Sequence, residues 1–356
     1  MRNIFYILLF TSHILSGQGL INDSHQIKYK TLPQKNKNIK EIQKYINDKA
    51  GSEKSQKYLG LLKTFARYDK NGNIIDYHKN KKFEFLSDRY KFFYKDGELF
   101  EIQKKGISDR TLYKWQFEDN LLCNEIKYNR KNIVNFKWSS TIEDGKIIKT
   151  EKLNRKKKIL YTIKYIYNNN LLEELKYINK KGKTKYYWKF MYDDKNRNIQ
   201  KVKYNSKNSF IESWKIEYTE NNDTLANIKY DSRGVAQNMK YFTYDNEGTL
   251  IGYKQYNKEE NIQNQWKYIY NENGLLIEEQ YFNKKGLASI NKYEYNGDQK
   301  LLNEKQFKYY GFYDPNFSYS IIKLFNYNNK GDVKEVIKKD IYNSIISITR
   351  YIYLYF

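Results

Sequence analysis

Large apolar and aromatic residues occupy every second position in many short segments of this chain. In one segment, Trp214, Ile216 and Tyr218 alternate with Lys215 and Glu217. A period of two with one apolar side is typical of a β-strand that buries one face. The same alternation is present in residues 163–167, 188–192 and 266–270. The pattern therefore predicts an all-β protein made of many half-buried strands.

These strands end at a tyrosine that leads into a turn rich in Asn, Asp and Gly. Tyr244-Asp-Asn-Glu-Gly248 and Tyr270-Asn-Glu-Asn-Gly274 are clear copies. Such residues tolerate the positive φ that closes a tight hairpin turn. Anchors recur at 167, 192, 218, 244, 270 and 295, and a second series lies between them at 177, 204, 230, 256, 281 and 307. One repeat is therefore about 26 residues long and contains two strands.

Two strands and two tight turns per repeat predict successive antiparallel hairpins. We predict a repetitive antiparallel β-hairpin meander that forms an extended or spiralling single sheet over residues 57–356. About 300 residues at ~13 per strand give roughly 20 to 23 strands. The chain has only two prolines, which fits this fold because proline cannot donate to a strand ladder.

The final residues, 351–356, alternate in the same way and end in Phe356. A terminal strand of this kind also occurs in outer-membrane barrels. Such barrels need strands of ~9–11 residues with an apolar band facing lipid. The strands here are shorter and carry charges throughout, which argues against a membrane barrel. The alternation leaves open whether the sheet lies flat, coils or closes.

The first 17 residues have the organisation of a secretory signal peptide. Arg2 precedes an apolar run from Ile4 to Phe10, and the small residues Ser16 and Gly17 follow. The apolar run is too short to span a bilayer, although a buried N-terminal strand or helix is an alternative. We predict a signal peptide at 1–17 and a protein that is secreted, periplasmic or at the cell surface.

Residues 18–56 are polar and rich in Lys, Asn and Gln. Within them, Ile39, Ile42, Tyr45 and Ile46 fall at helical spacing. We predict a polar linker that contains a short amphipathic helix.

The Tyr-Asp-x-x-Gly turn followed by an alternating strand resembles the YD or Rhs repeat. Tyr68-Asp-Lys-Asn-Gly72 and Tyr244-Asp-Asn-Glu-Gly248 match it well, and the resemblance covers roughly residues 58–330. MORN-like hairpin repeats are a second, weaker resemblance. The YD/Rhs resemblance implies a sheet ribbon that spirals into a shell or forms an extended surface structure. It also implies an accessory or truncated component of a toxin delivery or immunity system, because the strand pattern leaves no room for a toxin domain.

The chain is strongly basic, with 65 Lys and Arg against 41 Asp and Glu and a net charge of +24. Such a surface attracts anionic partners. Lysines interleaved with rings would also suit single-stranded nucleic acid, but an exported protein rarely meets it. We therefore expect an anionic envelope glycan or another surface protein as partner. Aromatic residues make up 17% of the chain, which excludes a disordered protein.

The sequence contains no recognisable catalytic motif. Three histidines, one of them in the leader, argue against a histidine-based metal centre. Neither a nucleophile elbow nor a zinc-protease motif is present. Cys123 lies in a strand-like segment, where we expect a small buried side chain without reactivity. We predict a non-enzymatic protein without a cofactor; a glycan-active enzyme would require a deep cleft with converging acids.

Trp188, Trp214 and Trp266 occupy equivalent positions in three repeats. Rings exposed on a sheet can stack on sugars, whereas buried rings would form columns of core. Both alternatives are open from sequence. We predict these three as binding residues of an exported envelope or surface protein that binds or scaffolds a glycan or a protein.

Overall fold

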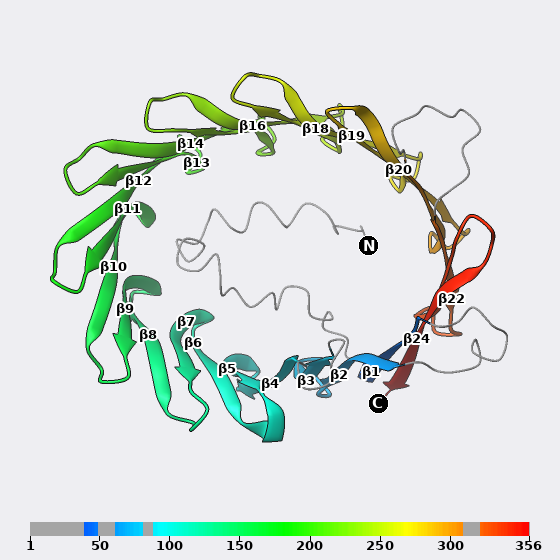
Figure 1. Cartoon of the computed structure of the whole chain (residues 1–356), viewed down its shortest axis with the longest axis horizontal. Helices are drawn as coiled ribbons and strands as arrows, with labels where there is room; N and C mark the ends of the chain where they lie inside the picture. The colour runs from blue at the N-terminus through cyan, green and yellow to red at the C-terminus, as the bar shows by residue number, and fades with distance from the viewer. Residues whose placement is uncertain (1–38, 49–60, 81–87, 309–320, 356) are drawn as a thin grey trace. The chain divides into compact units, whose positions relative to one another are not determined.

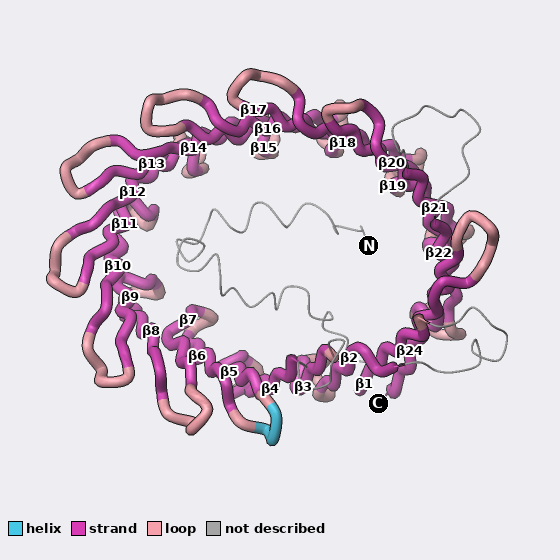
Figure 2. The backbone as a smooth tube through the Cα atoms, in the orientation of Figure 1, coloured by secondary structure: helices cyan, strands magenta, loops and turns pink. Residues whose placement is uncertain are grey.

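In a computed structural model, residues 39–48, 61–80, 88–308 and 321–355 are described. They form 24 β-strands, all in one antiparallel sheet, and one short 3₁₀ segment, η4 (Ile107–Asp109). Figure 2 shows that tight turns join most of the strands. The leader predicted at 1–17 lies outside the described residues.

The strands are β1 (Ile39–Asn47), β2 (Leu61–Tyr68), β3 (Ile74–Lys79), β4 (Asp88–Lys95), β5 (Glu98–Lys105), β6 (Thr111–Glu118), β7 (Leu121–Tyr128), β8 (Val134–Glu143), β9 (Lys146–Asn154), β10 (Ile159–Asn168), β11 (Leu171–Asn179), β12 (Thr184–Tyr192), β13 (Asn198–Asn205), β14 (Phe210–Tyr218), β15 (Thr224–Tyr230), β16 (Ala236–Tyr244), β17 (Leu250–Asn257), β18 (Ile262–Tyr270), β19 (Leu276–Asn283), β20 (Gly286–Tyr295), β21 (Leu301–Lys308), β22 (Ile321–Tyr327), β23 (Val333–Lys339) and β24 (Ile345–Tyr355).

The chain divides into two compact units. Among the described residues, unit 1 comprises 90–217 and 228–236. In it, β5 to β14 pair antiparallel in chain order, each with its neighbour in this series, and Figure 1 shows these strands side by side. Its buried cluster lies on one face of the sheet and consists of Ile147, Ile163, Tyr165, Leu172, Leu175 and Trp188.

Unit 2 comprises the described residues of 39–89, 218–227 and 237–355. Strands β16 to β24 pair in chain order, and β1 pairs with β2, which pairs with β3. A small buried cluster here consists of Ile39, Ala66 and Tyr68.

The first strand pairs with the last, so the predicted open or spiralling sheet is wrong. In β1, Lys44 lies opposite Tyr351 and Ile46 opposite Thr349 of β24. The 24 strands therefore belong to one antiparallel sheet in which β1 pairs with both β2 and β24. An open sheet leaves unpaired backbone groups on its first and last strands, and pairing them with each other satisfies these groups. The all-β class and the antiparallel hairpins were predicted correctly.

Residues 39–47 form strand β1, and the amphipathic helix predicted there is wrong. The apolar spacing suited a helix, but β1 hydrogen-bonds to β2 on one side and to β24 on the other. Two ladders and the burial of Ile39 outweigh the local periodicity. The sheet therefore begins inside the segment that we expected to be a linker.

The residue after each anchor tyrosine shapes the turn. In the turn after Tyr244, Asp245 Oδ1 accepts hydrogen bonds from the backbone N–H groups of Glu247 at 2.9 Å and Thr249 at 2.8 Å. Gly248 takes a φ of 80° and donates its N–H to the Asp245 carbonyl. This geometry explains why Asp or Asn follows the tyrosine in the repeat.

The anchor tyrosines also join neighbouring strands. The hydroxyl of Tyr244 donates to the carbonyl oxygen of Thr224 at 2.8 Å. The same bond recurs from Tyr167 to Ile147, Tyr192 to Leu172, Tyr270 to Leu250, Tyr295 to Leu276, Tyr327 to Leu301 and Tyr353 to Val333. Each such bond contributes about 1 kcal/mol to stability. The repeated tyrosine therefore stabilises the pairing of adjacent strands in both units.

Candidate binding face

In unit 1, rings and lysines lie opposite one another on a single face of the sheet. Glu125 lies between Trp115 and Trp138 on the two adjacent strands, and Lys152 follows on the far side of Trp138. Directly opposite residues of an antiparallel pair share a face. We call this the ring–lysine face; its members are Tyr113, Trp115, Glu125, Lys127, Phe136, Trp138, Lys152, Tyr161, Tyr177, Tyr186, Trp188, Lys201, Lys203, Glu212, Trp214 and Lys229.

The lysine ammonium groups sit over the rings. Lys152 Nζ lies 4.5 Å from the ring centroid of Trp138 and 4.9 Å from that of Phe136. Lys127 Nζ lies 5.4 Å from the ring centroid of Tyr113. A cation over a ring face gains about 0.5–2 kcal/mol, more when water is excluded. The rings therefore hold the ammonium groups in place.

A second group surrounds Trp188 and Trp214. Lys201 Nζ lies 4.6 Å from the Trp214 ring centroid, and Lys203 Nζ lies 5.2 Å from that of Trp188. The register places Lys203 opposite Trp188 and Lys201 opposite Trp214. Lys229 Nζ lies 4.7 Å from the Trp214 ring centroid. Contacts between rings and ammonium groups thus recur near the end of unit 1, beyond the rings of Tyr161, Tyr177 and Tyr186, which pack on one another.

Two carboxyls on this face differ in their environment. Glu125 is 3% exposed, and burial raises its pKa to about 7 against the opposing effects of the Trp115 hydrogen bond, Lys152 and Lys127. Burial also raises the pKa of Glu212, but hydrogen bonds from Lys229 and Lys203 outweigh it, so that this pKa is lowered. Near neutral pH, Glu212 is therefore ionised and Glu125 is partly neutral.

The sequence did not reveal Glu125 or the lysines as site residues. Glu125 and its two tryptophans are ten and thirteen positions apart along the chain, and only the strand register brings them together. The available signal was the alternation of Lys201 and Lys203 with Val202, which by itself would place the two lysines on a solvated face opposite an apolar one. Lys201 and Lys203 instead share the face of the rings.

The three predicted tryptophans fall in different surroundings. Trp188 is 6% exposed and belongs to the buried cluster, and its ring centroid lies 5.3 Å from that of half-buried Trp214. Trp266 lies in unit 2, where its ring is stacked between Tyr253 and Tyr281. The structure thus brings Trp188 and Trp214 together, and the binding role of all three stays a prediction.

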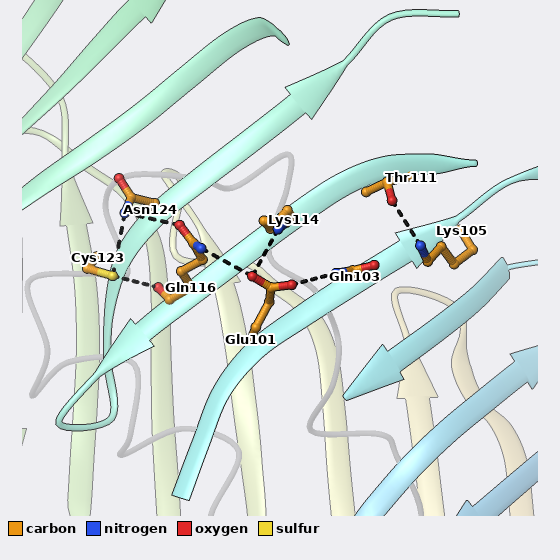
Figure 3. A network of polar contacts seen from close by, with 8 residues as sticks. All are labelled: Glu101, Gln103, Lys105, Thr111, Lys114, Gln116, Cys123 and Asn124. Atoms are coloured by element: carbon orange, nitrogen blue, oxygen red, sulfur yellow. Dashed lines mark hydrogen bonds and ion pairs between the residues drawn. The ribbon is translucent and has the colours of Figure 1, made fainter. Parts of the chain in front are cut away.

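The opposite face of the same strands carries a polar network (Figure 3). Glu101 accepts hydrogen bonds from Gln103 at 2.5 Å and from Gln116 at 3.1 Å, and it pairs with Lys114 at 3.1 Å. Burial raises the pKa of Glu101, but these partners outweigh it and lower it. Because its carboxylate is fully engaged, Glu101 serves as a structural link between β5 and β6.

Cys123 adjoins this network and is half-buried. Its thiol donates to the carbonyl oxygen of Gln116 at 3.1 Å. Burial raises the pKa of the thiol, followed in effect by Glu118. A raised pKa keeps the thiol protonated, as expected of an unreactive cysteine.

Two open hollows lie at turns in unit 2. One, of about 420 Å³, is lined by Glu220, Asp223 and Asp245 among others, and a second, of about 600 Å³, by Asn271, Tyr293 and Gln299 among others. In the part of the chain that the structure describes, no three His, Cys, Asp or Glu side chains are grouped for metal binding. No helix in that part is long and apolar enough to cross a membrane.

Comparison with known proteins gives no match to a family model and no match to a curated protein. A crystal structure of TcdB2-TccC3-TEV is similar at 12% identity and a TM-score of 0.41, over 80% of this chain and 15% of that chain. TcdB2-TccC3 gives 11% identity and a TM-score of 0.30, over 85% of this chain and 20% of that chain. A porin-like protein from Bacteroides uniformis gives 9% identity and a TM-score of 0.25, over 89% of this chain and 98% of that chain.

These three neighbours all have TM-scores below 0.5 and identities of 12% or less. This chain spans less than a quarter of the length of the TcdB2-TccC3 chains. Because no family model matches, the likeness to YD/Rhs repeats stays one of sequence pattern.

Proposed function

We propose that this is an exported, non-enzymatic binding protein of the cell envelope or surface that holds an anionic glycan on its ring–lysine face. One observation carries the proposal: between β6 and β15, this face sets five ammonium groups against two carboxyls. The lysines are Lys127, Lys152, Lys201, Lys203 and Lys229, and the carboxyls are Glu125 and Glu212.

The charge balance favours an anionic ligand. With both carboxyls ionised the face carries a net charge of +3, and it carries more when Glu125 is neutral. Ammonium groups over rings are partly dehydrated, which strengthens their attraction for anions. The half-buried rings of the face, among them Tyr186 and Trp214, offer apolar surface to the C–H groups of a sugar.

The arrangement also favours an extended ligand. Residues of the face recur on successive strands from β6 to β14, which are about 4.8 Å apart, so the row is about 38 Å long. A polymer lying across the strands would meet ammonium groups on β7, β9 and β13 in turn. Several weak contacts on one chain then add up to useful affinity.

A hydrolytic role receives less support. A carboxyl with a raised pKa suits a general acid, but glycoside hydrolysis needs a second carboxyl across the scissile bond. The residues directly opposite Glu125 on both neighbouring strands are Trp115 and Trp138. A neutral Glu125 between two rings instead raises the net positive charge of the face.

The test is calorimetric titration of the purified chain, without residues 1–17, with an anionic polysaccharide (alginate) and a neutral one (dextran). We expect binding to alginate alone, weakening as salt is raised. Replacing the five lysines of the face by Gln should abolish it. The matched control replaces five lysines of the opposite face, namely Lys137, Lys149, Lys164, Lys189 and Lys215. Equal loss in both variants, or equal binding to dextran, would contradict the proposal.

Export is tested separately by cell fractionation with intact-mass analysis. We expect a chain that lacks about 17 to 19 N-terminal residues, in the periplasm, at the surface or in the medium. A full-length chain in the cytoplasm would contradict the leader and favour single-stranded nucleic acid as the ligand of the same face.

A further inference from the structure

We propose that Lys201, Lys203 and Lys229 form a subsite for a tetrahedral oxyanion, the sulfate or phosphate ester of a glycan. The subsite rests on the proposed function and deepens it, since it names the group that the ring–lysine face recognises. Its floor is made by the rings of Trp188 and Trp214.

The three ammonium groups converge on the two rings. Lys201 Nζ lies 4.6 Å from the ring centroid of Trp214 and 5.7 Å from that of Trp188. Lys229 Nζ lies 4.7 Å from the Trp214 centroid, and Lys203 Nζ lies 5.2 Å from the Trp188 centroid. Lys201 and Lys203 extend from β13 and Lys229 from β15, so that three ammonium groups lie beside the side chains of β14, the strand between them.

Glu212 shows that this place already receives an anionic group. Its Oε1 lies 3.1 Å from Lys203 Nζ, and its Oε2 lies 3.0 Å from Lys229 Nζ. Both ammonium groups thus point at one pair of acidic oxygens. A ligand oxyanion would join or replace the carboxylate, with Lys201 as the third cation.

The local charge and exposure fit such a ligand. Three ammonium groups and one carboxylate leave a net charge of +2. The side chains of Lys229 and Lys203 are 39% and 23% exposed, so solvent and ligand reach them. A phosphate or sulfate ester offers three strong acceptor oxygens, one for each ammonium group, whereas a uronate offers two.

The test measures the affinity of the full mature chain for a heparin oligosaccharide and for the same oligosaccharide without its sulfates. Lys201→Met and Lys229→Met together keep the aliphatic stems on the rings and remove the charges. We expect about tenfold weaker binding of the sulfated ligand and less than about twofold change for the desulfated one. Inorganic phosphate should compete if a phosphate ester is equally accepted. Failure of phosphate to compete would restrict the subsite to sulfate.

The Glu212→Gln variant is expected to change the affinity for the sulfated ligand in the opposite direction. A gain in affinity cannot result from loss of folding. Removing the carboxylate raises the local charge from +2 to +3, so the sulfated ligand should bind about threefold more tightly. Lys189→Met with Lys215→Met, on the opposite face of the neighbouring strands β12 and β14, is the matched control and should change neither affinity.

The outcomes separate the two proposals. Unchanged affinity in both the Lys201/Lys229 and Glu212 variants would overturn the subsite, while alginate binding that is lost in the five-lysine variant would leave the proposed function in place. Failure of the unmodified chain to bind either alginate or the heparin oligosaccharide would overturn both.

Discussion

Trp214 in unit 1 and Trp266 in unit 2 occupy the same place in their repeats and have opposite neighbours. Trp214 is flanked by the ammonium groups of Lys201 and Lys229. Trp266 is flanked by the rings of Tyr253, with centroids 4.4 Å apart, and Tyr281, at 4.7 Å. The repeat therefore determines the position of a tryptophan in its strand. The residues on the two adjacent strands determine whether its ring contacts ammonium groups or other rings.

The difference separates a structural stack from a charged face. Three rings in contact, Tyr253 stacked on Trp266 and Tyr281 tilted against it, hold β17, β18 and β19 together by dispersion and apolar burial. Trp138 and Trp214 in unit 1 instead hold ammonium groups and contribute to a positive face, although Tyr161, Tyr177 and Tyr186 of the same unit also pack ring on ring. The comparison favours unit 1 as the location of the proposed binding, and the following experiments would break or sharpen this contrast.

The largest effect is expected from Trp266→Ala. Loss of two ring–ring contacts and the burial that accompanies them should lower the free energy of unfolding by about 3 kcal/mol. Affinity for the anionic glycan should not change, because Trp266 has no lysine at its opposite positions. Urea unfolding and calorimetry check both. Trp214→Ala is the counterpart and should weaken glycan binding; glycan affinity lost equally in the two variants would remove the contrast.

A somewhat smaller effect is expected from Glu125. Its folded-state pKa of about 7 lies above its usual value, so unfolding releases a proton between about pH 4.5 and 7. Stability should therefore fall as pH rises through this window, by roughly 2 to 3 kcal/mol, and Glu125→Gln should remove that component. Urea unfolding at pH 5 and pH 8 measures it.

Glu101 provides the control for this pH dependence. The pKa of Glu101 is lowered in the folded state. Its ionised carboxylate therefore adds to the free energy of unfolding at higher pH, and this stabilisation is lost as pH falls through the folded-state pKa. Glu101→Gln should therefore destabilise the protein at pH 8. A Glu125→Gln variant with the unfolding profile of the unmodified chain would show that Glu125 is not held neutral.

Tyr253→Lys tests whether unit 2 can be converted into a ring–lysine face. The substitution sets an ammonium group opposite Trp266, as Lys201 is set opposite Trp214. We expect a loss of about 1 kcal/mol in stability, because a stacked ring pair is replaced by a partly solvated cation. Binding of the anionic glycan should gain affinity. Tyr253→Gln removes the same stack without adding charge and should show the loss in stability alone.

The smallest effect is expected where the two units agree. Tyr192→Phe in unit 1 and Tyr244→Phe in unit 2 each remove one hydroxyl bond to the preceding strand. Each should cost about 1 kcal/mol in urea unfolding, without change in glycan affinity. Clearly unequal costs would show that the tyrosine bridge has different roles in the two units.

The sequence predicted the strands and turns because they depend on local rules. Alternation identifies a half-buried strand, and the Asp or Asn after Tyr244 or Tyr270 identifies the turn. The prediction of a helix at residues 39–47 was wrong, because the apolar spacing of this segment fits a helix. Only the pairing with β2 and β24 makes it a strand. The closing pair of strands is about 300 residues apart and leaves no mark in either segment.

The candidate site was only partly predictable for the same reason. Trp188 and Trp214 are visible as repeated aromatic positions. Lys201 and Lys203 lie in the intervening half-repeats, and their place beside the rings depends on register and on the bulge near each turn. A shift of one residue in that register would move both lysines to the opposite face.

The pairing of β1 with β24 makes the chain order of the sheet cyclic. Each described strand pairing would survive if the two ends were joined by a linker and the chain were opened at another turn, for example at Asn271–Gly274. Circular permutants should therefore fold to the same sheet. The permutants would differ chiefly in their folding rates. In each of them a different pair of strands would join the two ends of the chain, and that pair could form only after the last residues had been synthesised.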